Sequence, residues 1–290
     1  MTVRTDRIGA RPPGAIAGRL PDTGPRATAR RVGAMVLRYS FLFAKSWPRL
    51  VELIYWPTVQ VVLWGLISQF FLHHSSWLVQ ASGALLAAAL LWDVLFRSEL
   101  GVAVSFMEEM WSRNLGSLFV APLRPYEMAA ALLTMSLLRT LIGMVPASVV
   151  AILLYEYSIY DLGLPLLAFF VNLMVMGWAF GLVVCGLLFR WGLGAESVAW
   201  FAIFAIAPIS GIYYPISELP SWAQAIAMAL PPAHVFEGMR AVMFQGVFRT
   251  DLFLYASGLN ALYVTIGVVA FLYAFGVARR RGLILNSGAE

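Results

Sequence analysis

Six apolar runs, each long enough to cross a lipid bilayer, are the feature that most constrains this chain. A helix rises 1.5 Å per residue, so the ~30 Å of hydrocarbon in a bilayer needs about 20 apolar residues. The sequence is 61% hydrophobic and 12% charged, whereas a soluble domain carries about 25% charged residues. It therefore predicts an all-α integral membrane protein with six transmembrane helices, at about 52–72, 80–98, 127–154, 164–189, 197–214 and 253–277.

The basic residues predict how these spans are oriented. Of the 20 lysines and arginines, 17 fall before residue 50, at the end of the second span or in the connection after it, in the connection after the fourth span, or after the sixth span. Only Arg240 and Arg249 fall on the other side, and Arg139 falls within a span. Because cytoplasmic loops of membrane proteins are enriched in Lys and Arg, both termini are expected in the cytoplasm.

The composition divides the chain into three parts. Residues 1–31 are rich in Arg, Pro, Gly and Ala, which predicts a disordered basic cytoplasmic tail. Residues 32–282 form the transmembrane domain, and it opens with 32–50, where apolar residues mix with Arg38, Lys45 and Arg49 as in a helix at the membrane interface. Residues 283–290 are expected to form a cytoplasmic tail.

Two stretches are expected not to span. In residues 99–126, apolar side chains recur at helical spacing at Phe106, Met110 and Leu118, which predicts a short amphipathic helix that ends near Pro122. In residues 215–250, Pro231-Pro232 ends a helical segment of about eleven residues, too short to cross. Short re-entrant helices in the outer leaflet would satisfy their own backbone hydrogen bonds.

Catalytic machinery is not expected in this chain. A phosphate-binding loop needs Gly-Lys-Ser/Thr with another Gly five residues before the Lys. The single lysine, Lys45, precedes Ser46 but follows Ala44, with Ser40 at the other glycine position. The three histidines are too few for a redox centre, and no Asp, Glu and His have the spacing of metal ligands. We therefore expect no enzyme, no bound cofactor or metal, and no nucleic-acid partner, since the basic residues flank apolar runs.

Several residues are candidates for a transport pathway. Arg139 lies within the third span, where a charge needs an acidic, aqueous or backbone partner, and Asp93 is one candidate. Two interpretations are open: an electrostatic latch or contact with an anionic substrate, or a side chain that reaches the interface. Gly177 and Gly181 form a GxxxG pattern that permits close helix contact, for example in a dimer.

The outer end of the fifth span is the expected gate. Pro208, Gly211 and Pro215 are expected to unwind the helix there. His234, Glu237 and Arg240 follow at i, i+3 and i+6, so neighbouring pairs can form an ion-pair cluster that braces the gate.

Two segments resemble ABC-2 type permeases, the membrane halves of ABC exporters. Residues 108–118 (EEMWSRNLGSL), followed by Ala121-Pro122-Leu123 and Glu127, resemble the loop between spans two and three of that family. Residues 208–220 (PISGIYYPISELP), followed by Leu230-Pro231, His234, Glu237 and Arg240, resemble the end of span five and the outer re-entrant helices. The resemblance extends over roughly residues 35–280.

The resemblance implies a coupling helix that docks on a separate ATP-binding subunit. Its candidate contact residues are Phe106, Glu108, Glu109, Met110, Arg113, Gly116, Leu118 and Pro122. Two ATP-binding subunits, which hold ATP and Mg²⁺, and a second permease copy, identical or homologous, would complete an exporter in the bacterial cytoplasmic membrane. Its substrate would be amphipathic or lipid-linked: a drug, a glycolipid or a saccharide. The alternative is an ATP-independent carrier or a membrane assembly factor.

Overall fold

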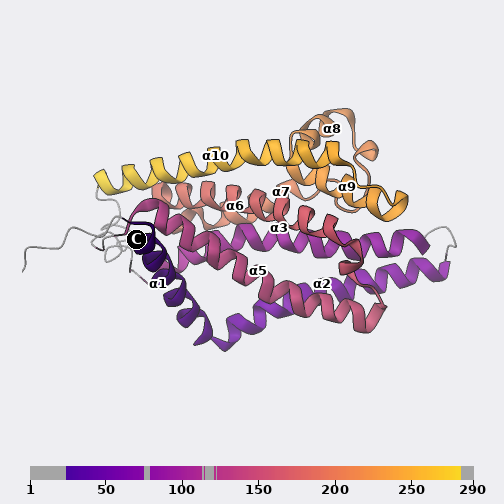
Figure 1. The fold of residues 1–290 in the computed structure, drawn as a ribbon, viewed down its shortest axis with the longest axis horizontal. Coiled ribbons are helices and arrows are strands. Elements are labelled where there is room, and N and C mark those ends of the chain that lie inside the picture. Colours follow the sequence, from indigo (N-terminus) through magenta and orange to yellow (C-terminus); the bar gives the residue numbers. More distant parts are fainter. Residues whose placement is uncertain (1–23, 75–78, 113, 115–120, 122, 282–290) are drawn as a thin grey trace, which may run out of the picture.

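The computed structural model describes residues 24–74, 79–112, 114, 121 and 123–281, and every regular element among them is a helix (Figure 1). The predicted all-helical class is confirmed for this part of the chain. In chain order the helices are α1 (Pro25–Ala44), α2 (Trp47–His74), α3 (Val79–Trp111), α5 (Pro125–Tyr155), η2 (Ile159–Leu162), α6 (Leu164–Trp191), η3 (Gly192–Ala195), α7 (Glu196–Ile206), η4 (Ile216–Glu218), α8 (Ser221–Met228), α9 (Pro231–Gln245) and α10 (Thr250–Arg281).

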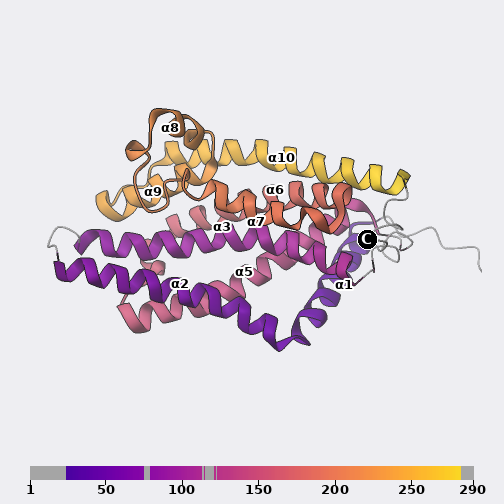
Figure 2. The same ribbon diagram turned by 180° about the vertical axis from the view of Figure 1, so that it is seen from behind.

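The long helices lie side by side in an elongated bundle whose two ends differ (Figures 1 and 2). α6 packs against α3 and α10, and α5 packs against α2 and α3. One end holds α1, the start of α5 and the end of α10. We call it the basic end, because its exposed arginines include Arg26, Arg30, Arg190, Arg279 and Arg280. The opposite end holds η2, α8 and α9.

Four stretches of the described residues are long and apolar enough to cross a membrane: Trp47–Phe70, Pro125–Tyr155, Leu164–Ile206 and Thr250–Arg280. The third is 43 residues long and takes in α6, η3 and α7, for which the sequence predicts two spans. α3 is not among the four: its described side chains begin at residue 83, and from there Asp93, Arg97 and Glu99 interrupt its apolar part.

α3 corrects the prediction for the residues after the second span. The sequence predicts that this span ends near residue 98 and that a separate short helix follows. Instead, α3 continues to Trp111. Residues 99–111 contain no proline that would end the helix. Their apolar side chains at Val102, Phe106 and Met110 keep helical spacing and pack against the core, so the helix continues through this segment. The predicted separate helix is therefore wrong for this segment.

The first two helices also begin and end differently from the prediction. α1 begins at Pro25, seven residues before the expected start of the interface helix, and ends at Ala44. α2 begins at Trp47, so residues 32–50 contribute to two helices. Pro48 lies in the first turn of α2, where its missing N–H removes no helical hydrogen bond. Residues 1–23 and 283–290 of the predicted tails lie outside the described residues.

α7 is shorter than the predicted fifth span. It ends at Ile206 after 11 residues, which is about 16 Å, or half of the hydrocarbon thickness. Pro208 follows without a backbone N–H, and Gly211 has φ 62°, in the left-handed region that glycine enters without strain. The expected loss of helix between 208 and 215 is therefore present in the structure.

The GxxxG pattern joins two helices of the same chain. A Cβ atom at Gly181 would lie 2.6 Å from Cβ of Val102, and one at Gly177 would lie 1.8 Å from Oγ of Ser98. Both glycines therefore let α6 approach α3 closely. The close helix contact that the pattern permits is therefore made within this chain, between α6 and α3.

Candidate functional site

Seven charged side chains form a cluster inside the basic end, where four helices meet. We call it the arginine–glutamate cluster: Arg31 and Arg38 of α1, Arg49 of α2, Glu108 and Glu109 of α3, and Glu127 and Arg139 of α5. All three glutamates are buried. A buried carboxylate costs several kcal/mol unless it is paired and hydrogen-bonded, so these partners decide whether the helices can pack in this way.

Glu108 lies between two arginines from different helices. Nη1 of Arg49 donates to Oε1 of Glu108 at 3.0 Å, and Nη2 of Arg139 donates to both carboxylate oxygens at 2.9 and 3.1 Å. The side chains of Arg139 and Glu108 are each 6% exposed, whereas that of Arg49 is 44% exposed. The Arg139 guanidinium also lies over the ring of Phe43 of α1, 5.1 Å from its centroid. Glu108 and Arg139 thus connect α1, α2, α3 and α5.

Arg139 is paired with Glu108 and not with Asp93, the candidate partner that the sequence offers. Asp93 is bonded instead to Arg97 of its own helix, with 2.6 Å between Oδ2 and Nε. Asp93 lies 15 residues before Glu108 on α3, about 22 Å along the helix axis. The acidic partner of Arg139 therefore comes from the end of α3, within the segment that the sequence predicts to lie outside the span.

Glu109 binds the interface helix. Nη2 of Arg38 donates to Oε2 of Glu109 at 2.7 Å, and Tyr39 is completely buried beside this pair. Burial and the neighbouring Glu109 carboxylate raise the pKa of the Tyr39 hydroxyl above its usual range, so the phenol stays neutral. Glu108 and Glu109 are adjacent in sequence, so α3 is attached to α1 and α5 within one helical turn.

Glu127 joins α1 to the start of α5. Nη2 of Arg31 donates to Oε1 at 2.6 Å, and Nε of Arg31 donates to both carboxylate oxygens at 2.9 and 3.0 Å. Oε2 of Glu127 also accepts the backbone N–H of Arg124 at 3.0 Å, which satisfies a donor left open at the helix start. One carboxylate therefore holds both the helix terminus and the interface helix.

The predicted coupling residues divide into two groups. Phe106, Glu108, Glu109 and Met110 are buried in α3, and Phe106 packs edge-on against Phe189 with 4.6 Å between ring centroids. Their side chains face the interior of this chain, so they are not the surface contacts that the sequence predicts. The other four, Arg113, Gly116, Leu118 and Pro122, lie outside the described residues.

A second candidate site lies at the opposite end, where α7 has ended. Nη2 of Arg240 donates to the carbonyl of Gly211 at 2.8 Å and to Oε1 of Glu237 at 2.9 Å. Oε1 of Glu237 accepts the backbone N–H of Ile216 at 2.8 Å. The side chains of Tyr213 and Trp64 of α2 stack with 4.1 Å between ring centroids. The ion pair on α9 therefore binds a backbone carbonyl within the non-helical segment 207–215 and the first backbone N–H of η4, directly after it.

The remaining gate candidates lie around this pair but bind elsewhere. Glu237 and Arg240 form the predicted ion pair, whereas His234 is not part of it. Nε2 of His234 lies 2.9 Å from the carbonyl of Met228, and its ring stacks on Tyr255 of α10. Pro208 accepts a hydrogen bond from the Tyr214 hydroxyl through its carbonyl, and Pro215 precedes η4.

The chain matches the model of the ABC-2 type transporter family over residues 36–244, which is most of its length. The chain belongs to the ABC-2 type transporter family. No curated protein matches it. The chain is therefore a permease of an ABC-type transporter, a multi-pass membrane protein and a transport subunit.

The ABC-2 match includes both candidate sites. It takes in the segment 207–215 with Glu237 and Arg240, and every member of the arginine–glutamate cluster except Arg31. The sequence does not single out Arg31, Arg38 and Arg49 as site residues: all three serve only as cytoplasmic charges, and Arg38 and Arg49 also as polar residues of an interface helix. The spacing of Arg31 and Arg38 could have indicated a shared site, because residues seven apart lie on one face of a helix.

Proposed function

We propose that this ABC-2 permease is the membrane-spanning subunit of an ATP-driven exporter. It moves an amphipathic or lipid-linked substrate, such as a drug, a glycolipid or a saccharide, out of the cytoplasm or the inner leaflet. The arginine–glutamate cluster is the observation that carries the proposal, since it connects the end of α3 to α1, α2 and α5 directly before the connection to α5.

Six spans with both termini in the cytoplasm are part of the proposal. α3 is the span that adds to the apolar stretches, because its 33 residues extend about 50 Å and Asp93 and Arg97 neutralise each other. α7 and the turns after it supply the fifth. The exposed arginines of the basic end support its placement on the cytoplasmic side of a bacterial inner membrane.

Energy enters at the basic end. Two ATP-binding subunits hold ATP and Mg²⁺ and dock on the connection between α3 and α5, with Arg113, Gly116, Leu118 and Pro122 as contacts. Phe106, Glu108, Glu109 and Met110 act behind that surface. Their buried ion pairs and core packing transmit a displacement of the connection to α1, α2 and α5, because breaking a buried ion pair costs about 3–5 kcal/mol.

Cargo leaves at the opposite end. The segment 207–215 has few helical hydrogen bonds of its own and depends on Arg240 and Glu237, so it can open without the bundle coming apart. Two permease copies, identical or homologous, form the pathway between them. Pro208 and Pro215 shape this gate, and His234 packs beside it against Met228 and Tyr255.

Purification of the tagged permease from its native membranes tests the proposal. We expect stoichiometric recovery of an ATP-binding subunit and ATP hydrolysis by the complex in lipid nanodiscs. The matched pair of variants is Glu109→Gln, which removes a buried charge of the cluster, and Glu52→Gln, the same change at an exposed position of α2. Repeated absence of an ATP-binding subunit, together with ATP-independent transport, would favour a carrier and refute the exporter.

A further inference from the structure

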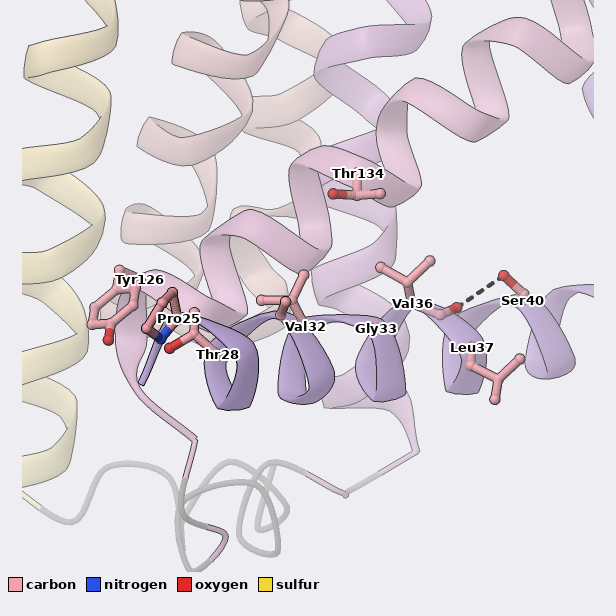
Figure 3. A pocket seen from close by; sticks show the side chains of 10 residues that line it. Pro25, Thr28, Val32, Gly33, Val36, Leu37, Ser40, Tyr126 and Thr134 are labelled. Carbon is pink, nitrogen blue, oxygen red and sulfur yellow. Dashed lines mark hydrogen bonds between the residues drawn. The ribbon is translucent and has the colours of Figure 1, made fainter. Parts of the chain in front are cut away.

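An open groove runs between α1 and α5 at the basic end, with a volume of about 910 Å³ (Figure 3). Figure 3 shows Tyr126 beside Pro25 and Thr28 at one end of the groove, and Leu37 and Ser40 at the other. The volume lies in the range of small-molecule pockets, about 300–1,000 Å³. From Pro25 to Ser40 the groove follows α1 for about 22 Å at 1.5 Å per residue.

The wall of the groove suits a hydrocarbon chain. Val32, Val36 and Leu37 line it. Of the four hydroxyls that reach it, those of Ser40 and Thr134 are bonded to backbone carbonyls, and those of Thr28 and Tyr126, at the Pro25 end, accept hydrogen bonds from arginines. Oγ of Ser40 donates to the carbonyl of Val36 at 2.8 Å, and Oγ1 of Thr134 donates to the carbonyl of Ala130 at 2.8 Å. One leaflet of the ~30 Å bilayer core is about 15 Å thick, so an acyl chain fits within the length of the groove.

Positive charge lies beside the groove at its Pro25 end. Arg26 and Arg30 are exposed, one helical turn apart, and have no carboxylate partner among the residues that the structure describes. They are adjacent in sequence to the lining residues Pro25 and Ala29. Nη1 of Arg124 donates to the Tyr126 hydroxyl at 2.6 Å, which adds a third guanidinium near this end. Arg31, in contrast, is bonded to Glu127.

We propose that this groove binds an anionic phospholipid of the surrounding membrane, with one acyl chain between α1 and α5 and the phosphate at Arg26 and Arg30. An apolar wall beside unpaired cations suits an amphipathic anion better than any other membrane component. The proposal rests on the membrane placement given above and not on transport. Bound lipid would fix the angle of α1, the helix that the arginine–glutamate cluster attaches to α3.

Photo-crosslinking of the full chain in phosphatidylcholine nanodiscs tests this site. The probes are phosphatidylglycerol and phosphatidylcholine, each with a diazirine on the acyl chain, and the labelled peptides are identified by mass spectrometry. We expect the peptides of α1 and of the start of α5 to carry at least threefold more label from phosphatidylglycerol. Higher salt should reduce this preference, because exposed charges are screened.

Matched variants separate the groove from the rest of the membrane surface. Gly33 lines the groove and a Cβ atom there meets no atom within 4 Å, so Gly33→Phe is chosen to place a ring in the groove, and Gly258→Phe makes the same change at an exposed position of α10. We expect at least a threefold loss of groove labelling in the first variant and no loss in the second. Arg26→Gln with Arg30→Gln should abolish the preference for phosphatidylglycerol.

The outcomes against the proposal are specific. Equal labelling of wild type and Gly33→Phe would mean that the groove is not the site. Equal labelling of wild type by both probes would mean that the arginines do not select an anion. Absence of label from both would point to another occupant, such as a transported substrate. If Gly33→Phe does not fold, the exposed double arginine variant decides the matter. No readout uses ATP or a partner subunit, so failure here leaves the exporter proposal standing.

Discussion

The two ends of the bundle use buried charge for different purposes. At the basic end, carboxylates bind arginines that lie 31 to 96 residues away, on other helices. At the opposite end, Glu237 and Arg240 lie three residues apart on α9 and bind backbone groups of Gly211 and Ile216. The first arrangement fixes helices to one another, and the second replaces hydrogen bonds that a broken helix has lost.

This difference separates a rigid region from one that can open. A helix that is attached by buried ion pairs cannot leave its neighbours without exposing an unpaired charge. The non-helical segment 207–215 is held by hydrogen bonds to Arg240, by the stacking of Tyr213 on Trp64 and by the burial of Ile212, and it contains no charged residue, so it can open without leaving a buried charge unpaired. In an ABC-2 permease, the basic end is therefore suited to transmit force, and the opposite end is suited to act as a gate.

The largest expected effect is at Arg139. Arg139→Leu leaves Glu108 buried with only the half-exposed Arg49, which should lower the free energy of unfolding by about 3–5 kcal/mol. Thermal unfolding of the purified protein in detergent measures the loss. Arg249→Leu removes an exposed ion pair with Asp251 and serves as the control, with no resolvable shift. A variant as stable as wild type would mean that the cluster does not hold the helices.

A double-mutant cycle on Arg38 and Glu109 asks how strongly α1 is attached to α3. Because Glu109 is buried and Arg38 is one-third exposed, we expect a coupling free energy of about 1.5–3 kcal/mol. The cycle combines Arg38→Gln, Glu109→Gln and the double variant, each measured by chemical unfolding. Strictly additive effects would show that the contact adds nothing and would weaken the contrast between the two ends.

Arg240 tests the opposite end. Arg240→Leu leaves the carbonyl of Gly211 without its donor, at a cost of about 1–3 kcal/mol. Hydrogen–deuterium exchange should show faster exchange in residues 207–220, while α3 and α5 at the basic end stay protected. Faster exchange across the whole bundle would instead mean that the gate and the basic end unfold as one unit.

The smallest expected effect is at His234. Its ring makes one hydrogen bond, to the carbonyl of Met228, and takes no part in the Glu237–Arg240 pair. His234→Ala should therefore cost about 1 kcal/mol and leave exchange in 207–215 unchanged. A loss as large as that of Arg240→Leu would place His234 in the gate after all.

The sequence predicts what depends on local apolar pattern and misses what depends on packing. α5, α6 and α10 agree closely with predicted spans, because a run of 20 or more apolar residues determines them without reference to neighbours. The end of α7 follows from Pro208 and Gly211, which act on their own backbone.

The local apolar pattern could not predict the partner of Arg139. It depends on how far α3 continues and on which face it turns to α5, and both are set by contacts between helices. The same holds for Glu108 and Glu109, which the sequence places on a surface helix and the structure places in the core. Their charge suggests exposure, but Arg38 and Arg139 from other helices make burial possible.

We propose that the arginine–glutamate cluster transmits a displacement from the ATP-binding subunits to the segment 207–215. The direct test is the distance between spin labels at the exposed positions Phe41 of α1 and Met228 of α8, with Cys185 replaced by Ser, in the complex in nanodiscs. On ATP and vanadate, this distance should shift in wild type and in Glu52→Gln, and it should not shift in Glu109→Gln. An undiminished shift in Glu109→Gln would contradict the account.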